Sequence, residues 1–388
     1  MENLFRRYFK GDRVIWLVVV LLSIVSLLAV YSSTGSLAYR FQGGNTAHYF
    51  IRQFSFLGAG LAIIFLVHLV SYKVYSPLAP MLLYIAIPLL VITLFFGTNI
   101  NQATRWLEIP GLGITIQTSD FAKLALIMYT ARILSLKQNN ISDLKSSFLP
   151  LVLPIVVVCL LILPANFSTA VMLGAICWIM LFIGRVNLRY LLGFTGLGVI
   201  LIGLFVYIAI QSDSINRVQT WKNRIENYSS GNTGENYQAE QSKIAIATGG
   251  IVGKGPGNST QRNLLPHPYS DFIYAIIIEE YGFMGGLFIM LLYLILLYRA
   301  GLIVKKARRT FPAFLAIGLT LVIVFQAMIN MAVAVNLIPV TGQPLPLVSM
   351  GGTSLLFSGV SIGILLSISR SQNKEELFDG EEEVKANY

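Results

Sequence analysis

The chain has few charged residues: Asp, Glu, Lys and Arg make up 12% of its 388 residues, whereas hydrophobic residues make up 55%. A soluble domain of this length cannot bury so much apolar surface, so the composition excludes a soluble globular protein. The two cysteines and three histidines are scattered, which gives neither a disulfide framework nor a metal-ligand spacing. The sequence also lacks a Walker lysine motif, which argues against an ATP-driven pump. A polytopic membrane protein is the class that fits.

Long apolar runs provide the membrane-spanning segments. Crossing a hydrocarbon core of about 30 Å takes roughly 20 apolar residues as a helix, because every backbone N–H group must find its partner within the segment. Ten runs meet or approach this length, so the predicted fold class is an all-α polytopic membrane protein with ten transmembrane helices. The expected spans are Val14 to Val30, Phe54 to Val70, Pro77 to Phe96, Phe121 to Ser135, Phe148 to Leu163, Thr169 to Gly184, Leu191 to Ile210, Phe272 to Leu297, Ala313 to Val335 and Ser354 to Ser369.

An even number of spans places both termini on one side of the membrane. Basic residues resist translocation, and most Lys and Arg residues fall on the side of the N-terminus, so both termini are predicted to be cytoplasmic. The large loop at residues 211–270, between the seventh and eighth helices, is then extracytoplasmic. We interpret its cations as an anion-binding feature, with tolerated surface charge as the alternative. These cations are Arg217, Lys222, Arg224, Lys243, Lys254 and Arg262.

The spans form a single integral-membrane domain, residues 1–370, because no internal repeat or separate soluble domain interrupts them. Residues 371–388 carry six acidic residues and two lysines, and we expect them to form a disordered acidic cytoplasmic tail. No small-residue cleavage pattern follows the first apolar run, so this run is expected to be a retained helix.

Asp271 is the acidic residue that stands directly before the apolar run at residues 272–297. Its structural interpretation is a helix cap or first-turn acid that the helix dipole favours. Its chemical interpretation is a general base, since a carboxylate at the membrane surface can accept a proton from a sugar hydroxyl. Deeper in the same run, Glu279 and Glu280 are expected to be packing or ion-pair residues first and a proton relay second.

Basic residues and glycines accompany Asp271. Lys254 lies in GGIVGKGPG, residues 249–257, where glycines let backbone N–H groups approach a phosphate, although such turns are most often plain turns. Arg105 could pair with a phosphate, and Lys123 could present its ammonium group to an anionic headgroup. Asp120 precedes Lys123 by three residues, so on a helix the two side chains could instead neutralise each other.

A loop rich in proline and glycine, residues 336–354, precedes the last span. Unwound backbone at membrane depth is tolerated where it lines a cavity, so the loop is a candidate wall of the site. Its Ser349, Gly351 and Gly352 are candidate substrate-binding residues. Gln241, at the start of a moderately apolar helical run, is another.

These motifs resemble those of the SEDS family of bacterial cell-wall polymerases, the family of FtsW, RodA and SpoVE. The resemblance covers nearly the whole chain, in the family's order of motifs: RW, QTSDFAKLA, ANFSTA, YQAEQSKIAIATGGIVGKGPGNSTQ, LPHPYSDFIYAIIIEEYG and GQPLPLVSMGGTSLLFSGVSIGILLSISR. It implies a peptidoglycan glycosyltransferase that polymerises lipid II at the outer face of the cytoplasmic membrane and releases undecaprenyl diphosphate. The ending of the chain is more similar to the division members than to the elongation members.

The resemblance also implies site residues and partners. Asp271 matches the family's catalytic aspartate, and Arg105 and Lys123 match its basic residues. The implied partners are lipid II, the nascent glycan strand, a class B penicillin-binding transpeptidase and other division proteins, without nucleic acid. No acidic cluster marks a metal site, although a divalent cation is compatible with the reaction. The full set of candidate substrate-binding residues is Arg105, Lys123, Gln241, Lys254, Arg262, Ser349, Gly351 and Gly352.

Two positions depart from the family pattern: Asn166 and His267 stand where the family usually has an acidic residue. Two alternatives from other functional classes also remain. One is a lipid II flippase with Glu279, Glu280 and Lys123 as its charged path. The other is a non-catalytic scaffold of cell division.

Overall fold

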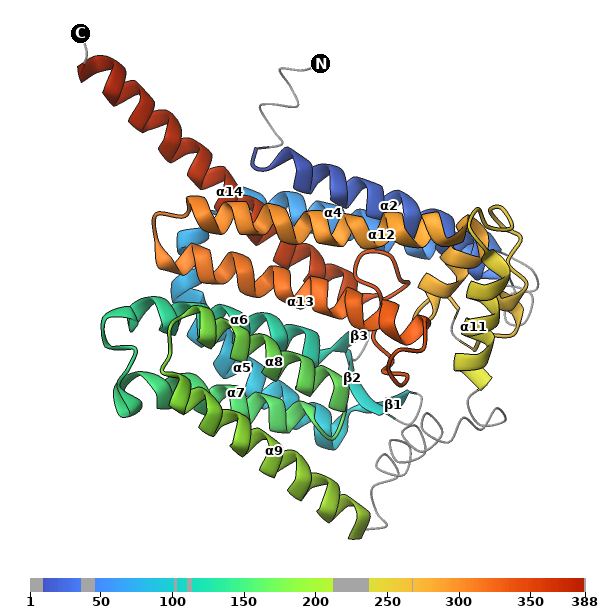
Figure 1. The fold of residues 1–388 in the computed structure, drawn as a ribbon, viewed down its shortest axis with the longest axis horizontal. Helices are drawn as coiled ribbons and strands as arrows, with labels where there is room; N and C mark the ends of the chain where they lie inside the picture. The colour runs from blue at the N-terminus through green and yellow to red at the C-terminus, as the bar shows by residue number, and fades with distance from the viewer. Residues whose placement is uncertain are drawn as a thin grey trace.

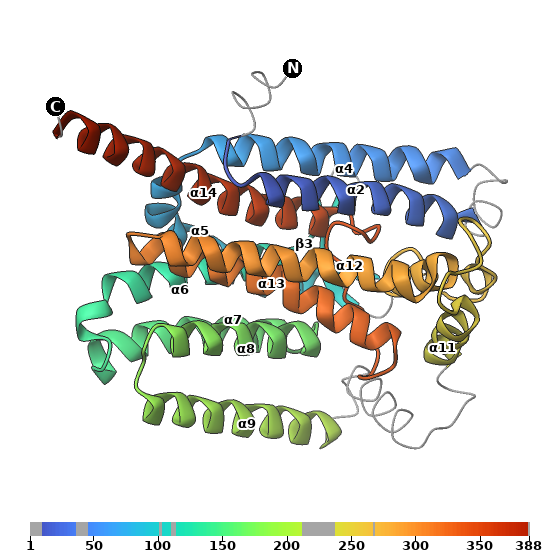
Figure 2. The same cartoon turned by 45° about the horizontal axis from the view of Figure 1, so that its top comes forward.

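The computed structural model describes residues 10–35, 46–100, 103–109, 114–211, 237–266 and 268–386. Within these ranges the long helices run side by side in one bundle, and a small sheet and the helix α11 lie toward one end of it (Figures 1 and 2). The helices are α2 (Arg13–Ser33), α4 (Thr46–Leu69), α5 (Tyr75–Phe96), α6 (Thr118–Leu136), α7 (Leu149–Ile162), α8 (Phe167–Ile183), α9 (Leu188–Gln211), α11 (Tyr237–Gly249), α12 (Ile273–Lys306), α13 (Thr310–Ala334) and α14 (Thr353–Ala386). Short helical turns are η1 (Tyr72–Val74), η2 (Gln138–Asn140), η3 (Leu144–Phe148) and η4 (Gln261–Asn263).

Seven helical segments among the described residues are long and apolar enough to cross a membrane, in agreement with a multi-pass membrane protein. They are α2, α4, α5 with η1, α7 with η3, α12, α13 and the first part of α14. Apolar stretches in α8 and α9 are shorter. α6 is not among these seven, because the charged residues Asp120, Lys123 and Arg132 within it lower its apolar character. The count of ten spans therefore stays a prediction.

α13 lies at the centre of the bundle, beside α6, α8, α12 and α14. In its apolar stretch, 72% of the residues are buried. α9 lies at the edge, where it contacts α8 (Figure 2). Val199 and Ile200 of α9 are both more than half exposed. α9 therefore leaves much of its apolar surface uncovered by the rest of the described chain.

A three-stranded antiparallel sheet corrects the prediction of an all-α fold. Strands β1 (Thr98–Ile100), β2 (Ala103–Ile109) and β3 (Ile114–Gln117) are ordered β1-β2-β3 between α5 and α6. Trp106 lies opposite Gln117 and Leu107 opposite Ile116. Three consecutive β-branched residues in β3, Ile114, Thr115 and Ile116, favour this conformation. The strands were missed because they are only three to seven residues long.

α12 is broken at Gly282, whose backbone has φ 71° and ψ −173°. The backbone on either side of the break therefore lacks some of its helical partners, and the loop that follows α11 supplies them. The N–H groups of Phe283 and Met284 donate to carbonyls of Gly250 (2.9 Å) and Ile251 (3.4 Å). In return, the N–H groups of residues 254 and 255 donate to the carbonyls of residues 279 (3.0 Å) and 280 (2.9 Å). The loop thus completes the hydrogen bonding of α12.

The break also turns the first part of α12, residues 273–281, back toward the second. In a continuous helix, residues 274 and 286 would be roughly 18 Å apart along the axis. Instead, a Cβ atom placed on Gly286 would lie 3.1 Å from the Tyr274 hydroxyl. The sequence prediction of one regular span at residues 272–297 did not include this bend.

The last helix, α14, continues beyond the bundle to Ala386 (Figure 1). Its last turns, residues 371–386, lie in the acidic segment that the sequence predicts to be a disordered tail. Five glutamates and two lysines stand there, and both residue types favour a helix intrinsically.

Candidate functional site

Asp271 lies in the turn that leads into α12, and its carboxylate does not cap the helix. The N-cap position is Phe272, which makes no side-chain capping bond. Among the described residues, the carboxylate of Asp271 accepts one hydrogen bond, from the Ser270 hydroxyl at 3.0 Å, and the side chain is partly exposed. The structure therefore leaves this carboxylate available for another partner, which weakens the capping interpretation.

The backbone of Asp271 is held by α13. The Asn330 side-chain amide donates to the Asp271 carbonyl at 2.9 Å and to the Gln343 carbonyl at 2.7 Å. Asn330 is 1% exposed, so one buried amide joins α13, the Asp271 turn and the loop rich in proline and glycine that precedes α14, here called the Pro-Gly loop. Sequence analysis did not select Asn330, although a polar amide in an apolar helix is a signal of this kind.

The Pro-Gly loop, residues 336–352, packs against the same turn, as the sequence analysis expects of a wall of the site. The Ser349 hydroxyl donates to the Ser270 carbonyl at 2.6 Å, and the Met350 N–H group donates to the Tyr269 carbonyl at 2.9 Å. Ser349 also accepts from the Leu345 N–H group at 2.7 Å, which closes a turn within the loop. The predicted Ser349 is therefore next to Asp271, but its hydroxyl is used in holding the backbone.

Arg52 is a cation near the Asp271 turn that sequence analysis left without a role. Burial raises the pKa of the Tyr269 hydroxyl, the Asp271 carboxylate and Tyr49 raise it further, and the Arg52 guanidinium lowers it. These groups are therefore close enough to act on one another electrostatically. Arg52 and Tyr49 both lie in the first turns of α4, and the Arg52 side chain is exposed.

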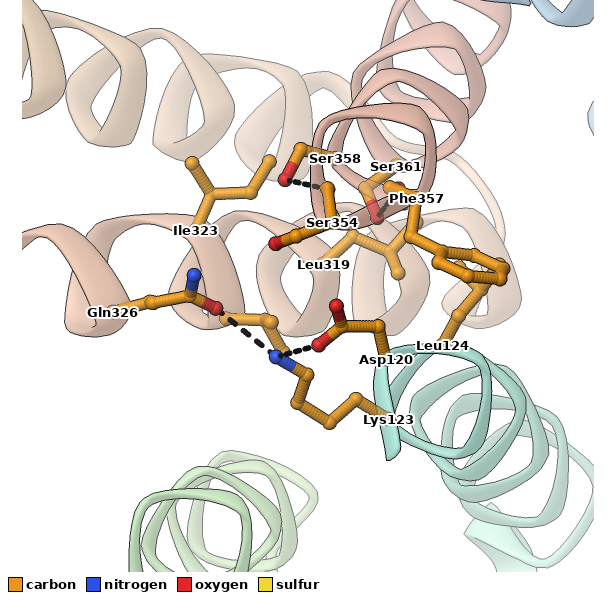
Figure 3. A pocket seen from close by; sticks show the side chains of 11 residues that line it. Asp120, Lys123, Leu124, Leu319, Ile323, Gln326, Ser354, Phe357, Ser358 and Ser361 are labelled. Carbon is orange, nitrogen blue, oxygen red and sulfur yellow. Dashed lines mark hydrogen bonds and ion pairs between the residues drawn. The ribbon is translucent and has the colours of Figure 1, made fainter. Parts of the chain in front are cut away.

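Lys123 is buried and paired, as the structural alternative for this residue predicted. Its ammonium group lies 2.7 Å from the Asp120 carboxylate and donates to the Gln326 side-chain oxygen at 3.0 Å (Figure 3). The side chains of Lys123 and Asp120 are 7% and 3% exposed. The Gln326 amide donates in turn to the Pro344 carbonyl at 2.9 Å. Gln326 thus connects Lys123 to the Pro-Gly loop.

A small cavity adjoins this ion pair between α6, α13 and α14, lined by Asp120, Lys123, Gln326 and the α14 serines Ser354 and Ser358 (Figure 3). The volume within it that the centre of a water molecule can occupy is about 20 Å³. That is room for about one water. The second carboxylate oxygen of Asp120 has no hydrogen-bond partner among the described residues.

Lys254 and Arg262, two predicted phosphate ligands, also contact the protein. The Lys254 ammonium group lies 2.6 Å from the Glu279 carboxylate, which confirms an ion-pair role for Glu279. The Arg262 guanidinium donates to the carbonyl (3.0 Å) and the hydroxyl (3.3 Å) of Ser32 in α2. Ser32 also donates to Glu280. Glu279 therefore holds the loop that follows α11, residues 250–266, here called the outer loop, and Glu280 holds α2.

The glycines of the loop are explained by close packing on α12. A Cβ atom on Gly249 would lie 2.2 Å from the Ile278 carbonyl oxygen, and one on Gly253 would lie 2.2 Å from that of Glu280. Gly253 also has a φ of +89°, which glycine adopts without strain. These two glycines approach the protein's own backbone rather than a ligand.

The remaining predicted residues lie at the same end. The backbone of Arg105 belongs to β2, but the prediction for its side chain lies outside what the structure describes. The prediction for His267 also lies outside the described residues. Gln241 is partly buried in α11, and Gly351 and Gly352 directly precede α14.

Two further features bear on chemistry. Asn166 caps α8 by accepting from the Thr169 N–H group at 3.3 Å, so it has a structural role in place of the family's usual acid. Among the residues that the structure describes, no group of three His, Cys, Asp or Glu side chains is placed to hold a metal ion.

Relatives of the chain are similar over nearly its full length. A probable peptidoglycan glycosyltransferase FtsW from Trichlorobacter lovleyi is 35% identical over 369 residues, which cover 94% of each chain. The stage V sporulation protein E of Bacillus subtilis is 34% identical over 366 residues, covering 92% of this chain and 97% of the relative.

Solved structures show the same fold. A chain of a peptidoglycan synthase complex, described for its coordination of polymerization and crosslinking, superposes with a TM-score of 0.71 at 22% identity, covering 93% of this chain and 98% of that one. The rod shape determining protein RodA of Thermus thermophilus superposes with a TM-score of 0.66 at 22% identity, covering 94% and 99%. The model of the cell cycle protein family matches residues 12–374. The chain therefore belongs to the cell cycle protein family of FtsW, RodA and SpoVE.

Proposed function

We propose that this protein is a peptidoglycan glycosyltransferase of cell division that polymerises lipid II into glycan strands. The relatives named as probable peptidoglycan glycosyltransferases FtsW support the activity and the division role. The observation that carries the proposal is the Asp271 carboxylate, which is partly exposed, free of a capping role and held on a rigid turn between α13 and the Pro-Gly loop.

In the proposed mechanism, Asp271 is the general base. It takes the proton from the 4-hydroxyl of the acceptor's GlcNAc, and the resulting oxygen nucleophile attacks the anomeric carbon of the donor's MurNAc. A new glycosidic bond forms as the bond to undecaprenyl diphosphate breaks. Asn330 and Ser349 hold the backbone carbonyls of residues 271 and 270, which restricts where the carboxylate can lie. This favours proton transfer, because donor and base must be within hydrogen-bonding distance.

The leaving diphosphate needs cations, because negative charge develops on it as the bond breaks. We place it toward Arg105 and toward Arg52, which acts electrostatically on the Asp271 turn. Lys123 and Arg262 already contact protein groups, so we propose that they shape the walls of the site. Gln241, Gly351 and Gly352 are proposed to line the path of the sugar chain, and Lys254 is considered below.

The outer end of the bundle is proposed to face the extracytoplasmic side of the cytoplasmic membrane, with ten spans and the loop at residues 211–270 outside. The protein of the matching synthase complex works with a crosslinking activity. We propose a class B penicillin-binding transpeptidase as the corresponding partner of this chain. A flippase path through Glu279, Glu280 and Lys123 has less support, because all three contact protein groups.

Replacement of Asp271 tests the proposed base. We expect Asp271→Asn to lower polymerisation of purified lipid II by roughly 100- to 10,000-fold, the usual contribution of a general base. Glycan chains separated by gel electrophoresis give the readout. The thermal unfolding midpoint should stay unchanged, since the carboxylate caps no helix.

The matched control is Glu108→Gln, which removes an exposed acid from β2 at the same end of the protein. This variant should polymerise lipid II like the wild type. Retained polymerisation by a correctly folded Asp271→Asn variant would exclude Asp271 as the base.

A further inference from the structure

The outer loop is fastened to α12 by the carboxylate of Glu279, which is fully buried. Lys254 donates to it at 2.6 Å, and Thr260 donates through its N–H group (3.1 Å) and its hydroxyl (2.9 Å). The Gln261 N–H group (3.3 Å) and the Ser259 hydroxyl complete the set. A buried carboxylate with this many donors is well compensated for its burial, so it holds residues 254–261 in one arrangement.

The fastened segment leads directly to Asp271. The Gln261 carbonyl accepts from the N–H groups of Leu264 (3.0 Å) and Leu265 (2.9 Å). Leu265 is 4% exposed and packs in a small cluster with Phe272, Ile276 and Val333. Phe272 is the chain neighbour of Asp271, so a short series of contacts joins Glu279 to the turn that carries Asp271.

The same segment covers the break in α12. Because the break at Gly282 leaves backbone groups for the loop to satisfy, the first part of α12 lacks the rigidity of a continuous helix. Its position relative to α13 then depends on the loop that fills the break. Lys254 contacts Glu279 through both its backbone and its side chain: its N–H group donates to the Glu279 carbonyl, and its ammonium group pairs with the Glu279 carboxylate.

We infer that Glu279 and Lys254 are positioning residues, which hold the outer loop in the α12 break and thereby place Asp271 against α13. The inference rests on the proposed function for its catalytic consequence. Lys254 then acts mainly through Glu279 and not as a ligand of the donor diphosphate. This role differs from the phosphate-binding role that the glycine-rich motif indicates.

The experiment combines steady-state kinetics on lipid II with hydrogen exchange of peptides from residues 268–281, in purified full-length protein. The variants are Glu279→Gln, Lys254→Met and the conservative Lys254→Arg. The matched control is Lys73→Met, which removes an exposed lysine from η1, outside the loop and the proposed site. Lys254→Met keeps the test decisive if Glu279→Gln does not fold, because Lys254 is 27% exposed and lies at the surface.

We expect Glu279→Gln and Lys254→Met to lower kcat by roughly 10- to 100-fold, the penalty typical of a misplaced catalytic group. KM for lipid II should change by less than about threefold, because uniform substrate binding is retained. Exchange in residues 268–281 should rise in both variants. Lys254→Arg should restore kcat and protection, since a guanidinium also donates to Glu279.

Three results would overturn the inference: wild-type kcat in Lys254→Met, unchanged exchange in residues 268–281, or a raised KM with unchanged kcat. The last would make Lys254 a substrate ligand instead. A wild-type protein without polymerase activity would refute the proposed function alone, and the exchange measurements would still decide whether the Glu279 contact holds the Asp271 turn.

Discussion

Three carboxylates lie at the start of α12, and they differ in what they contact. Glu279 accepts hydrogen bonds from residues 254–261, and Glu280 accepts from Ser32. The Asp271 carboxylate accepts only from its neighbour Ser270 among the described residues. Burial with full hydrogen bonding suits a structural carboxylate, whereas a base needs a free lone pair toward the substrate. At the residue scale, the contacts therefore distinguish the proposed base from its neighbours.

The ion pair of Asp120 and Lys123 allows a prediction about stability. Lys123→Met should lower the free energy of unfolding by about 3–5 kcal/mol, because it leaves the buried Asp120 carboxylate without its cation. Asp120→Asn combined with Lys123→Met should lose clearly less, since no unpaired charge remains. Thermal unfolding in detergent measures the difference between the variants.

The control for that series is Lys73→Met, in the short connection before α5, where the side chain is exposed. It should leave the unfolding midpoint unchanged, as expected for a surface lysine. A double variant as unstable as Lys123→Met alone would show that the charge of Asp120 is not the cause.

At the element scale, hydropathy predicts most helices because a spanning helix must be apolar over a known length. The spacing of three residues also predicts the contact of Asp120 with Lys123. The contact of Lys254 with Glu279 spans 25 residues of chain and needs the break in α12, which no local pattern reveals. Gly282 reads as an ordinary glycine inside an apolar run.

Gly282 itself carries a prediction about this element. A Cβ atom there would lie 2.1 Å from the Ile251 carbonyl oxygen and 2.6 Å from the Gly253 nitrogen, at a φ of +71°. These are backbone atoms and cannot move aside, so Gly282→Ala should displace the loop and lower polymerisation by roughly 10- to 100-fold. Lipid II polymerisation and hydrogen exchange of residues 249–261 measure the two effects.

Gly301 in the second part of α12 is the matched control. It is exposed, and a Cβ atom there would meet nothing within 4 Å. Gly301→Ala should therefore keep full activity, and should slightly stabilise the helix because alanine favours it. Equal activity of the two variants would contradict the importance of the break.

At the scale of the whole molecule, the length of α12 bears on where the site lies. Its 34 residues would extend to roughly 51 Å as one helix, well beyond a hydrocarbon core of about 30 Å. The second part, residues 283–306, is about 36 Å long and suffices to cross the membrane. Because the first part turns back at Gly282, it adds little to this length, and we expect Asp271 to lie near the end of the span, where a carboxylate and a sugar can meet water.

The basic residues Lys305 and Lys306 end α12, and Arg309 precedes α13, so the positive-inside rule assigns this end to the cytoplasm. Asn258 in the outer loop should then be extracytoplasmic. We expect Asn258→Cys to react with a membrane-impermeant maleimide on intact spheroplasts, and Arg309→Cys to react only after lysis. Both positions are exposed, whereas Cys159 and Cys177 lie within apolar helices and should give little background. Reaction of Asn258→Cys only after lysis would place Asp271 on the cytoplasmic side and contradict polymerisation at the outer face.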